Sequence, residues 1–134
     1  MTEARHINDG MLRLLAILAQ QFSPLETLLF DEIENGINPE ITEQVVDALV
    51  VSPKQTIVTT HSPMVLNYLE DEIARQSVTL LYKRPDGRTQ ACRFFDIPSA
   101  AQKLSCLAAG DAMLDLSLND IAVEADKIRS ASHV

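Results

Sequence analysis

Apolar residues in the first part of the chain predict a buried helix followed by a buried strand. Residues 11–22 are apolar on nearly every side except at Arg13, and a helix that is apolar all round is a buried one. Residues 26–30 form a short apolar run that stops at Asp31-Glu32. Such continuous apolarity is typical of a central parallel strand that is covered on both faces.

A second helix and a second strand are predicted next. Asn38-Pro39 places a capping residue and a proline at the start of a helix whose apolar residues recur at helical spacing. Residues 55–60 form a strand rich in β-branched residues, and Ser62-Pro63 begins a further helix. The order strand, helix, strand implies a right-handed crossover and a parallel sheet.

The rest of the chain predicts a hairpin and two helices. Residues 78–83 and 88–95 flank a Pro-Asp-Gly turn at residues 85–87, which is typical of a β-hairpin. Helices are expected near residues 99–109 and 120–130. The expected fold class is therefore α/β, with a parallel sheet and flanking helices, a β-hairpin and a helical C-terminal tail.

Composition and charge limit the kinds of partner. The chain has 134 residues, of which 46% are hydrophobic, and a net charge of −8. Because phosphate contacts need clustered Lys and Arg, we expect nucleic acid to bind only indirectly, through a larger assembly. No apolar run approaches the roughly 20 residues of a membrane span. A cytoplasmic protein without a membrane segment is expected, with Cys92 and Cys106 as free, buried thiols.

Two adjacent carboxylates follow the first predicted strand. Ligands of open α/β sheets bind at the carboxyl ends of strands, where paired acids are costly unless they meet a cation or a reacting water. We expect Asp31 to hold Mg²⁺, directly or through water, and Glu32 to polarise a water that attacks a γ-phosphate. A strand that ends at a solvated acidic turn is the alternative for this pair taken alone.

Two further segments are candidates for the same site. His61 follows the second strand, and it lies at the same sheet edge as the two carboxylates if the strands are neighbours. There it could hydrogen-bond a γ-phosphate oxygen, with a structural hydrogen bond as the alternative. Asn8, Asp9 and Gly10 precede the first helix, whose N-terminus offers N–H groups and a positive dipole end to a phosphate. The same residues also make an ordinary helix cap.

These segments, in this order, resemble the heads of the ABC-type ATPase superfamily, in particular the SMC-, RecF- and OLD-like heads that are often described as AAA-type ATPases. The resemblance covers nearly all of residues 7–95, with Asn8 where serine is usual. The matched motifs are the signature loop (residues 7–13), the Walker B strand (28–32), the D-loop (33–40) and the switch histidine (60–63).

The resemblance implies that the chain is the C-terminal part of an ATP-binding head, a partial P-loop NTPase fold of the ABC type. The Walker A loop of that family is glycine-rich and ends in Gly-Lys-Ser or Gly-Lys-Thr, and none of the four glycines here precedes such a pair. The implied segments are the signature loop and its helix (1–26), the Walker B to switch region (27–75), the hairpin (76–97) and the helical tail (98–134).

By resemblance, two heads enclose two ATP molecules, so ATP and Mg²⁺ are the implied cofactors. The implied partner is a Walker A-containing half or a second head, and we expect little hydrolysis by the chain alone. The implied site residues are Glu32 and His61 for catalysis, Asp31 for the metal, and Asn8, Asp9 and Gly10 for nucleotide binding. A non-catalytic regulatory or dimerisation module derived from such a head is the alternative.

Overall fold

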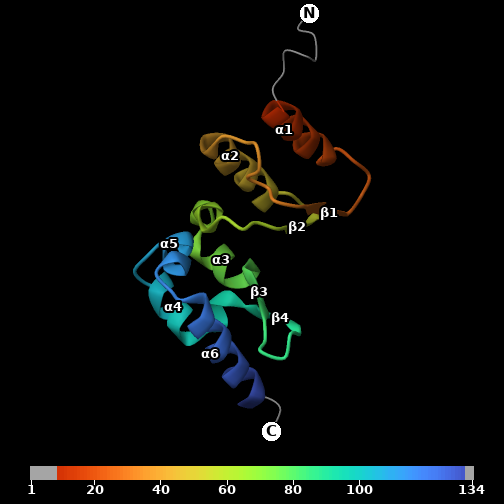
Figure 1. The fold of residues 1–134 in the computed structure, drawn as a ribbon. Helices are drawn as coiled ribbons and strands as arrows, with labels where there is room; N and C mark the ends of the chain where they lie inside the picture. Colours follow the sequence, from red (N-terminus) through yellow and green to blue (C-terminus); the bar gives the residue numbers. More distant parts are fainter. Residues whose placement is uncertain (1–8, 132–134) are drawn as a thin grey trace, which may run out of the picture. The chain divides into compact units, whose positions relative to one another are not determined.

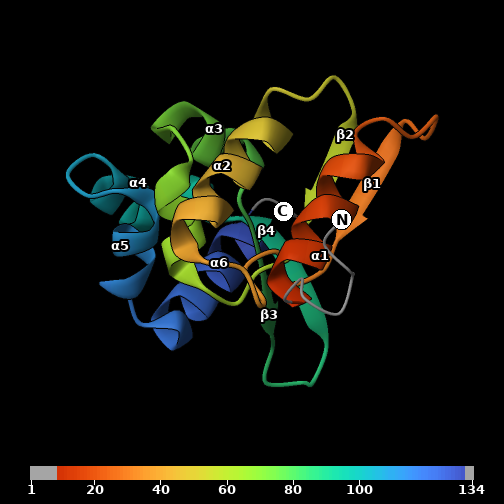
Figure 2. The same cartoon turned by 90° about the horizontal axis from the view of Figure 1, so that it is seen from above.

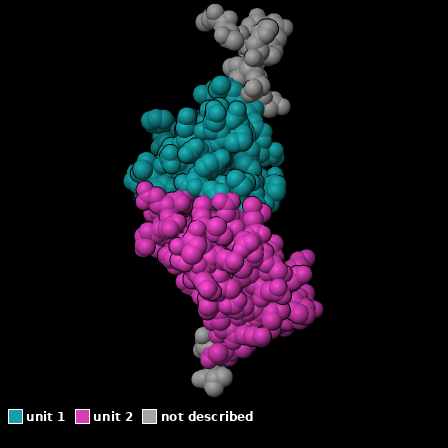
Figure 3. Space-filling model, turned by 90° about the vertical axis from the view of Figure 1, so that its left-hand side faces the viewer, with its two compact units in different colours: residues 1–68 teal, residues 69–134 magenta. Residues whose placement is uncertain are grey.

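The computed structural model describes residues 9–131 of the chain. Contacts between residues divide the chain into two compact units, Met1–Tyr68 and Leu69–Val134 (Figure 3). Each unit is described by itself below. Among the described residues, no helix has the length and apolarity needed to cross a membrane.

Unit 1 contains a parallel strand pair with helices beside it (Figure 1). Its elements are α1 (Asp9–Gln20), β1 (Thr27–Phe30), α2 (Pro39–Val50), β2 (Gln55–Val58) and the 3-10 helix η2 (Pro63–Tyr68). β1 pairs in parallel with β2, which confirms the parallel arrangement predicted from the order of the elements. The helix predicted at Ser62-Pro63 is present as the 3-10 helix η2.

Helix α2 begins as its sequence predicts. The Asn38 side chain accepts a hydrogen bond from the Glu40 backbone N–H at 3.0 Å, and Pro39 is the first helical residue. Pro fits there because its missing N–H would have no partner within the helix. The buried side chains of α2 recur at helical spacing and are Thr42, Val45, Val46 and Leu49.

Hydrogen bonds join the loop after α2 to the loop after α1. The Lys54 ammonium group donates hydrogen bonds to the backbone oxygens of Ser23, at 2.6 Å, and Leu25, at 2.5 Å. The Ser52 hydroxyl donates to the Gln21 side-chain oxygen at 2.7 Å. These contacts fix the chain where it enters β1, and hence the position of the carboxyl end of that strand.

Two predictions about burial in unit 1 are wrong. Among the described side chains of α1 only Ile17 is buried, so the helix is not enclosed. Its large exposed apolar residues are Met11, Leu12, Leu15 and Leu18. In β1, Leu28 is 3% exposed but Leu29 is 70% exposed, so the strand is covered on one face. The reason is that α1 and α2 lie on the same side of a sheet with two strands in the described chain (Figure 1).

Unit 2 is a hairpin packed with helices, seen from above in Figure 2. Its elements are α3 (Asp71–Ser77), β3 (Thr79–Lys83), β4 (Thr89–Arg93), the 3-10 helix η3 (Phe94–Asp96), α4 (Pro98–Leu104), α5 (Ala109–Leu114) and α6 (Leu118–Ala131). The antiparallel pairing of β3 with β4 confirms the hairpin. Gly87 has a φ of 82° in its turn, a conformation that glycine adopts without steric cost.

The helices of unit 2 differ in part from the sequence prediction. α6 confirms the last predicted helix. The helix predicted near residues 99–109 is present only in its first part, as α4, because residues 105–108 are not helical and α5 begins at Ala109. α4 ends next to Ser105, whose hydroxyl donates to the backbone oxygen of Gln102 at 2.6 Å and competes with the helical pattern. Helix α3 was not predicted.

Both cysteines are free, but Cys106 is exposed and Cys92 half-buried, so the expected burial of both thiols is wrong.

A polar contact links the hairpin to α6 within unit 2. The Asp126 carboxylate accepts hydrogen bonds from the Tyr82 hydroxyl and from Nε of Arg84, each at 2.9 Å. Partial burial of Asp126 works to raise the pKa of its carboxyl group. The hydrogen bonds and the positive charges of Arg84 and Arg129 outweigh this, so the pKa lies below its usual value.

Candidate functional site

The candidate site lies where β1 and β2 end. The Thr59 backbone N–H donates to the Phe30 carbonyl at 2.9 Å, and the Ile33 N–H donates to the Thr59 carbonyl at 3.2 Å. The parallel pairing therefore continues past both strands. Because the carboxyl ends of parallel strands meet at one sheet edge, Asp31 and Glu32 lie beside the segment that contains His61, as predicted.

Thr59 connects the two carboxylate residues. Its hydroxyl donates to Oδ1 of Asp31 and accepts the backbone N–H of Glu32 at 3.0 Å. The Asp31 side chain is thereby oriented at an exposed position, with its second oxygen available. In the sequence, Thr59 was included only in the strand predicted at residues 55–60. Its position directly after a strand that neighbours the carboxylates is the signal that could have singled it out.

Glu32 has an unusual backbone conformation. Its φ is 47°, in the left-handed region. Among the described residues other than glycine, Glu32 alone has a positive φ. A β-carbon makes this conformation unfavourable, and such outliers cluster at functional sites. Oε2 of Glu32 accepts a hydrogen bond from the Asn35 side chain at 3.3 Å, and the Glu32 side chain is 48% exposed. The turn thus holds a carboxylate out toward solvent at the sheet edge.

His61 lies between two carboxylates. Its Nδ1 is 3.7 Å from Oε1 of Glu32 and 3.6 Å from Oε1 of Glu34. The Ser62 backbone N–H donates to the Thr60 hydroxyl at 3.0 Å and closes the turn that contains the histidine. The imidazole is 74% exposed, so it is accessible to a ligand at this edge. The distances allow ion pairs when the imidazole is protonated.

Glu34 is a site residue that sequence analysis missed. Both of its carboxylate oxygens are shielded from solvent without a hydrogen-bond partner, and the side chain is 18% exposed. A shielded carboxylate is costly unless a positive group is near, and His61 is within ion-pair distance. Sequence analysis placed Glu34 in a D-loop-like segment, but its burial depends on contacts that no local pattern reveals.

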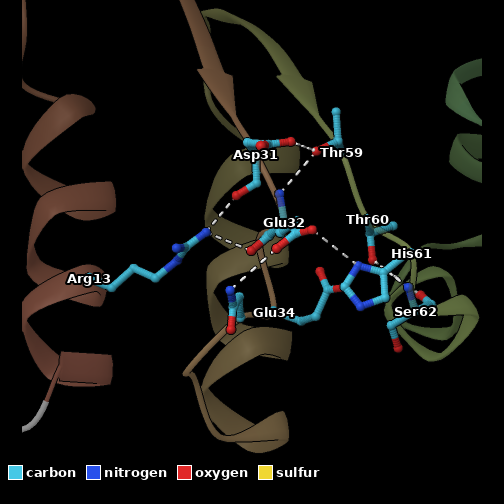
Figure 4. A network of polar contacts seen from close by, with 9 residues as sticks. Arg13, Asp31, Glu32, Glu34, Thr59, Thr60, His61 and Ser62 are labelled. Atoms are coloured by element: carbon cyan, nitrogen blue, oxygen red, sulfur yellow. Dashed lines mark hydrogen bonds and ion pairs between the residues drawn. The ribbon is translucent and has the colours of Figure 1, made fainter.

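Arg13 is the second residue that sequence analysis missed. From α1, its Nη2 donates to the backbone oxygens of Asp31, at 2.5 Å, and Glu32, at 2.6 Å. Figure 4 shows Glu32 between Arg13 and His61. The available signal was a lone charged residue in an otherwise apolar helix, which predicts a specific partner but not its identity.

The predicted nucleotide-binding segment is only partly described. Asn8 lies outside the described residues, and of Asp9 only the backbone is described, as the first residue of α1. Gly10 is the next residue of that helix and is half-buried. The structure therefore brings Asp31, Glu32 and His61 together and leaves the role of this segment as a prediction.

One family comparison bears on this site. Residues 2–67 match the family described as "AAA domain, putative AbiEii toxin, Type IV TA system". The match lies within unit 1 and includes Asp31, Glu32 and His61. It supports similarity of this segment to AAA-type, P-loop ATPase-like domains, and hence a nucleotide-binding, ATPase-like function in general terms. No curated protein matches the chain.

The carboxylate of Asp31 fits the Mg²⁺ that such domains typically use. Among the described residues, no group of three or more His, Cys, Asp or Glu side chains could hold a metal ion. Mg²⁺ is commonly held by one or two carboxylates together with phosphate oxygens and water. Asp31 supplies a carboxylate at the strand end, with Oδ1 oriented by Thr59.

Proposed function

We propose that this chain is the part of an ABC-type ATPase head that carries the metal-binding and water-activating carboxylates. The observation that carries the proposal is the meeting of Asp31, Glu32 and His61 at one sheet edge, with Glu32 in a left-handed conformation. Ligands bind at this edge in open α/β sheets. The match to an AAA-domain family over residues 2–67 supports the proposal at the level of an ATPase-like function.

Each of the three residues has a distinct proposed role. Asp31 would hold Mg²⁺, which neutralises charge on the phosphates when it is bound. Glu32 accepts a proton from the attacking water, and its half-exposed carboxylate is accessible to that water. His61 donates a hydrogen bond to a γ-phosphate oxygen from an exposed position close to Glu32. Asn8, Asp9 and Gly10 would contact the nucleotide of the opposing head.

We further propose that a Walker A-containing half completes the site. The sequence has no Gly-Lys-Ser or Gly-Lys-Thr to cradle phosphates. Parallel sheets are normally covered on both faces, whereas Leu29 of β1 and Ile57 of β2 are 70% and 49% exposed. A groove of about 470 Å³ also runs between α1 and β1. A completing half would cover these apolar surfaces while it supplies the phosphate-binding loop.

The proposal is tested by replacing the water-activating group. With the Walker A half supplied, on the same polypeptide or as a second chain, Glu32→Gln should lower ATP hydrolysis on the order of 10²- to 10⁴-fold. Binding of ATP should remain, because the amide keeps the size of the side chain. Glu43→Gln is the matched control, because Glu43 is exposed on α2. A wild-type rate in Glu32→Gln would remove Glu32 from the proposed role.

A non-catalytic regulatory or dimerisation module is the second candidate. The exposed apolar face of α1, with Leu15 at 52% exposed, is the observation in its favour. The two candidates differ in what the completed protein does. A completed head that binds a partner but hydrolyses no ATP, either as the wild type or as Glu32→Gln, would favour the non-catalytic module.

A further inference from the structure

Arg13 holds the two peptide groups on either side of the Glu32 Cα atom. One nitrogen, Nη2, donates to the carbonyl oxygens of Asp31 and Glu32 at 2.5 and 2.6 Å (Figure 4). These carbonyls belong to the peptide before and the peptide after Cα of Glu32. Because φ and ψ describe the rotation of these two peptides about Cα, a donor that holds both carbonyls restrains both angles of Glu32.

The left-handed conformation of Glu32 explains why one donor can reach both oxygens. In an extended strand, successive carbonyls point to opposite edges. At Glu32 the φ of 47° turns both toward α1. Two neutral donors assist, since the Glu32 N–H donates to Thr59 Oγ1 and the Asn35 N–H donates to the Glu32 carbonyl, both at 3.0 Å. Arg13 contributes the charged hydrogen bonds, which are the stronger kind.

We infer that Arg13 is a positioning residue that keeps Glu32 in its left-handed conformation and so aims its carboxylate. The catalytic consequence rests on the proposed function. Arg13 lies three residues after Gly10, on the same face of α1. It therefore links the helix start, proposed to contact the opposing nucleotide, with the water-activating group of this chain. A shift of α1 would break or re-form the hydrogen bonds of Arg13 that hold the backbone of Glu32.

A double-mutant cycle on the chain itself tests the positioning. Arg13→Ala should speed hydrogen exchange of the Ile33 amide, which bonds to the Thr59 carbonyl, on the order of ten- to a hundredfold. In a Glu32→Gly background the same substitution should change the rate by roughly threefold or less, because glycine adopts positive φ readily. Arg88→Ala, at an exposed hairpin arginine, is the matched control and should leave this amide unchanged.

Glu32→Ala separates backbone conformation from side-chain contacts. It removes the carboxylate, as Glu32→Gly does, but keeps the β-carbon. The large effect of Arg13→Ala on exchange of the Ile33 amide should therefore persist in the Glu32→Ala background. It should shrink only when residue 32 is glycine. Equal effects of Arg13→Ala in the glycine and alanine backgrounds would overturn the inference. If Arg13→Ala alone fails to fold, the combination with Glu32→Gly should fold, and failure of that combination would also overturn it.

A kinetic readout distinguishes this inference from the proposed function. In the completed head, Arg13→Ala should lower kcat by roughly tenfold or more while KM for ATP changes by no more than about twofold. A raised KM with unchanged kcat would contradict positioning. Failure of the proposed function gives a different result: Glu32→Gln hydrolyses ATP at the wild-type rate, while the exchange coupling between Arg13 and residue 32 is still present.

Discussion

At the scale of single residues, the site depends on side chains that hold the backbone as much as on those with proposed chemical roles. Asp31 and Glu32 follow β1 directly, and their backbones are held by Thr59 and Arg13. Glu32 remains in an unfavourable conformation because Thr59 accepts its backbone N–H while Arg13 donates to the carbonyl oxygens on either side of its Cα. The arrangement places strain at the residue proposed to activate water.

Thr59 offers a test of this support. Thr59→Val keeps the shape but removes the hydroxyl that joins the Asp31 carboxylate to the Glu32 N–H. It should lower the free energy of unfolding by about 1–2 kcal/mol, because both groups lose a partner. Thr59→Ser keeps the hydroxyl and serves as control in urea denaturation. Equal stability of the valine and serine variants would show that this hydroxyl does not support the site.

The sequence predicted the residues at the strand ends but not the residues that support them. Asp31, Glu32 and His61 were found because an apolar run that ends in polar residues marks a strand end, and parallel strands share an edge. Arg13 and Glu34 act across contacts between segments far apart in the chain. Neither has a local pattern that names its partner, so the structure was needed to identify them.

At the scale of elements, the boundaries with clear capping or turn signals were predicted, whereas burial was not. Asn38-Pro39 predicted the start of α2, and the Pro-Asp-Gly turn predicted the hairpin. The apolar residues of α1 predicted burial, yet Leu15 is exposed because burial depends on which elements pack against the helix. The apolar residues of a helix show which surface can be buried, and contacts within the described chain bury only part of that surface of α1.

The contact between the hairpin and α6 gives a pH-dependent prediction. Because the pKa of Asp126 is lowered on folding, its contribution to stability is complete above the usual aspartate pKa of about 3.9 and is lost as the pH falls through the lower, folded value. Asp126→Asn should therefore be less stable than wild type at neutral pH. The difference should shrink as the pH falls below about 3.9.

Thermal unfolding of both proteins across this pH range measures the difference. Asp47→Asn, at an exposed aspartate of α2, is the control and should follow the wild-type curve. A difference between wild type and Asp126→Asn that stays constant down to the lowest pH would show that the ionised carboxylate does not stabilise the contact with Tyr82 and Arg84.

At the scale of the whole molecule, the division after Tyr68 separates the candidate site from the hairpin and the last helices. The family match ends at residue 67, close to that division, so the proposed function belongs to unit 1. The sequence has no glycine or proline signal at residues 68–69, which is why local patterns did not predict the division. Unit 1 has exposed apolar strand faces beside the site proposed to hydrolyse ATP, and this combination is the basis for proposing a completing half.

The central claim is that this chain carries only part of a nucleotide site, and calorimetry with Mg-ATP tests it most directly. The purified 134-residue chain is titrated beside Asp31→Asn, with Asp47→Asn as a control that removes an equal charge elsewhere. The account predicts no measurable binding to any of the three, because the phosphate-cradling loop is missing. Tight binding by the wild-type chain and Asp47→Asn that disappears in Asp31→Asn would contradict the account.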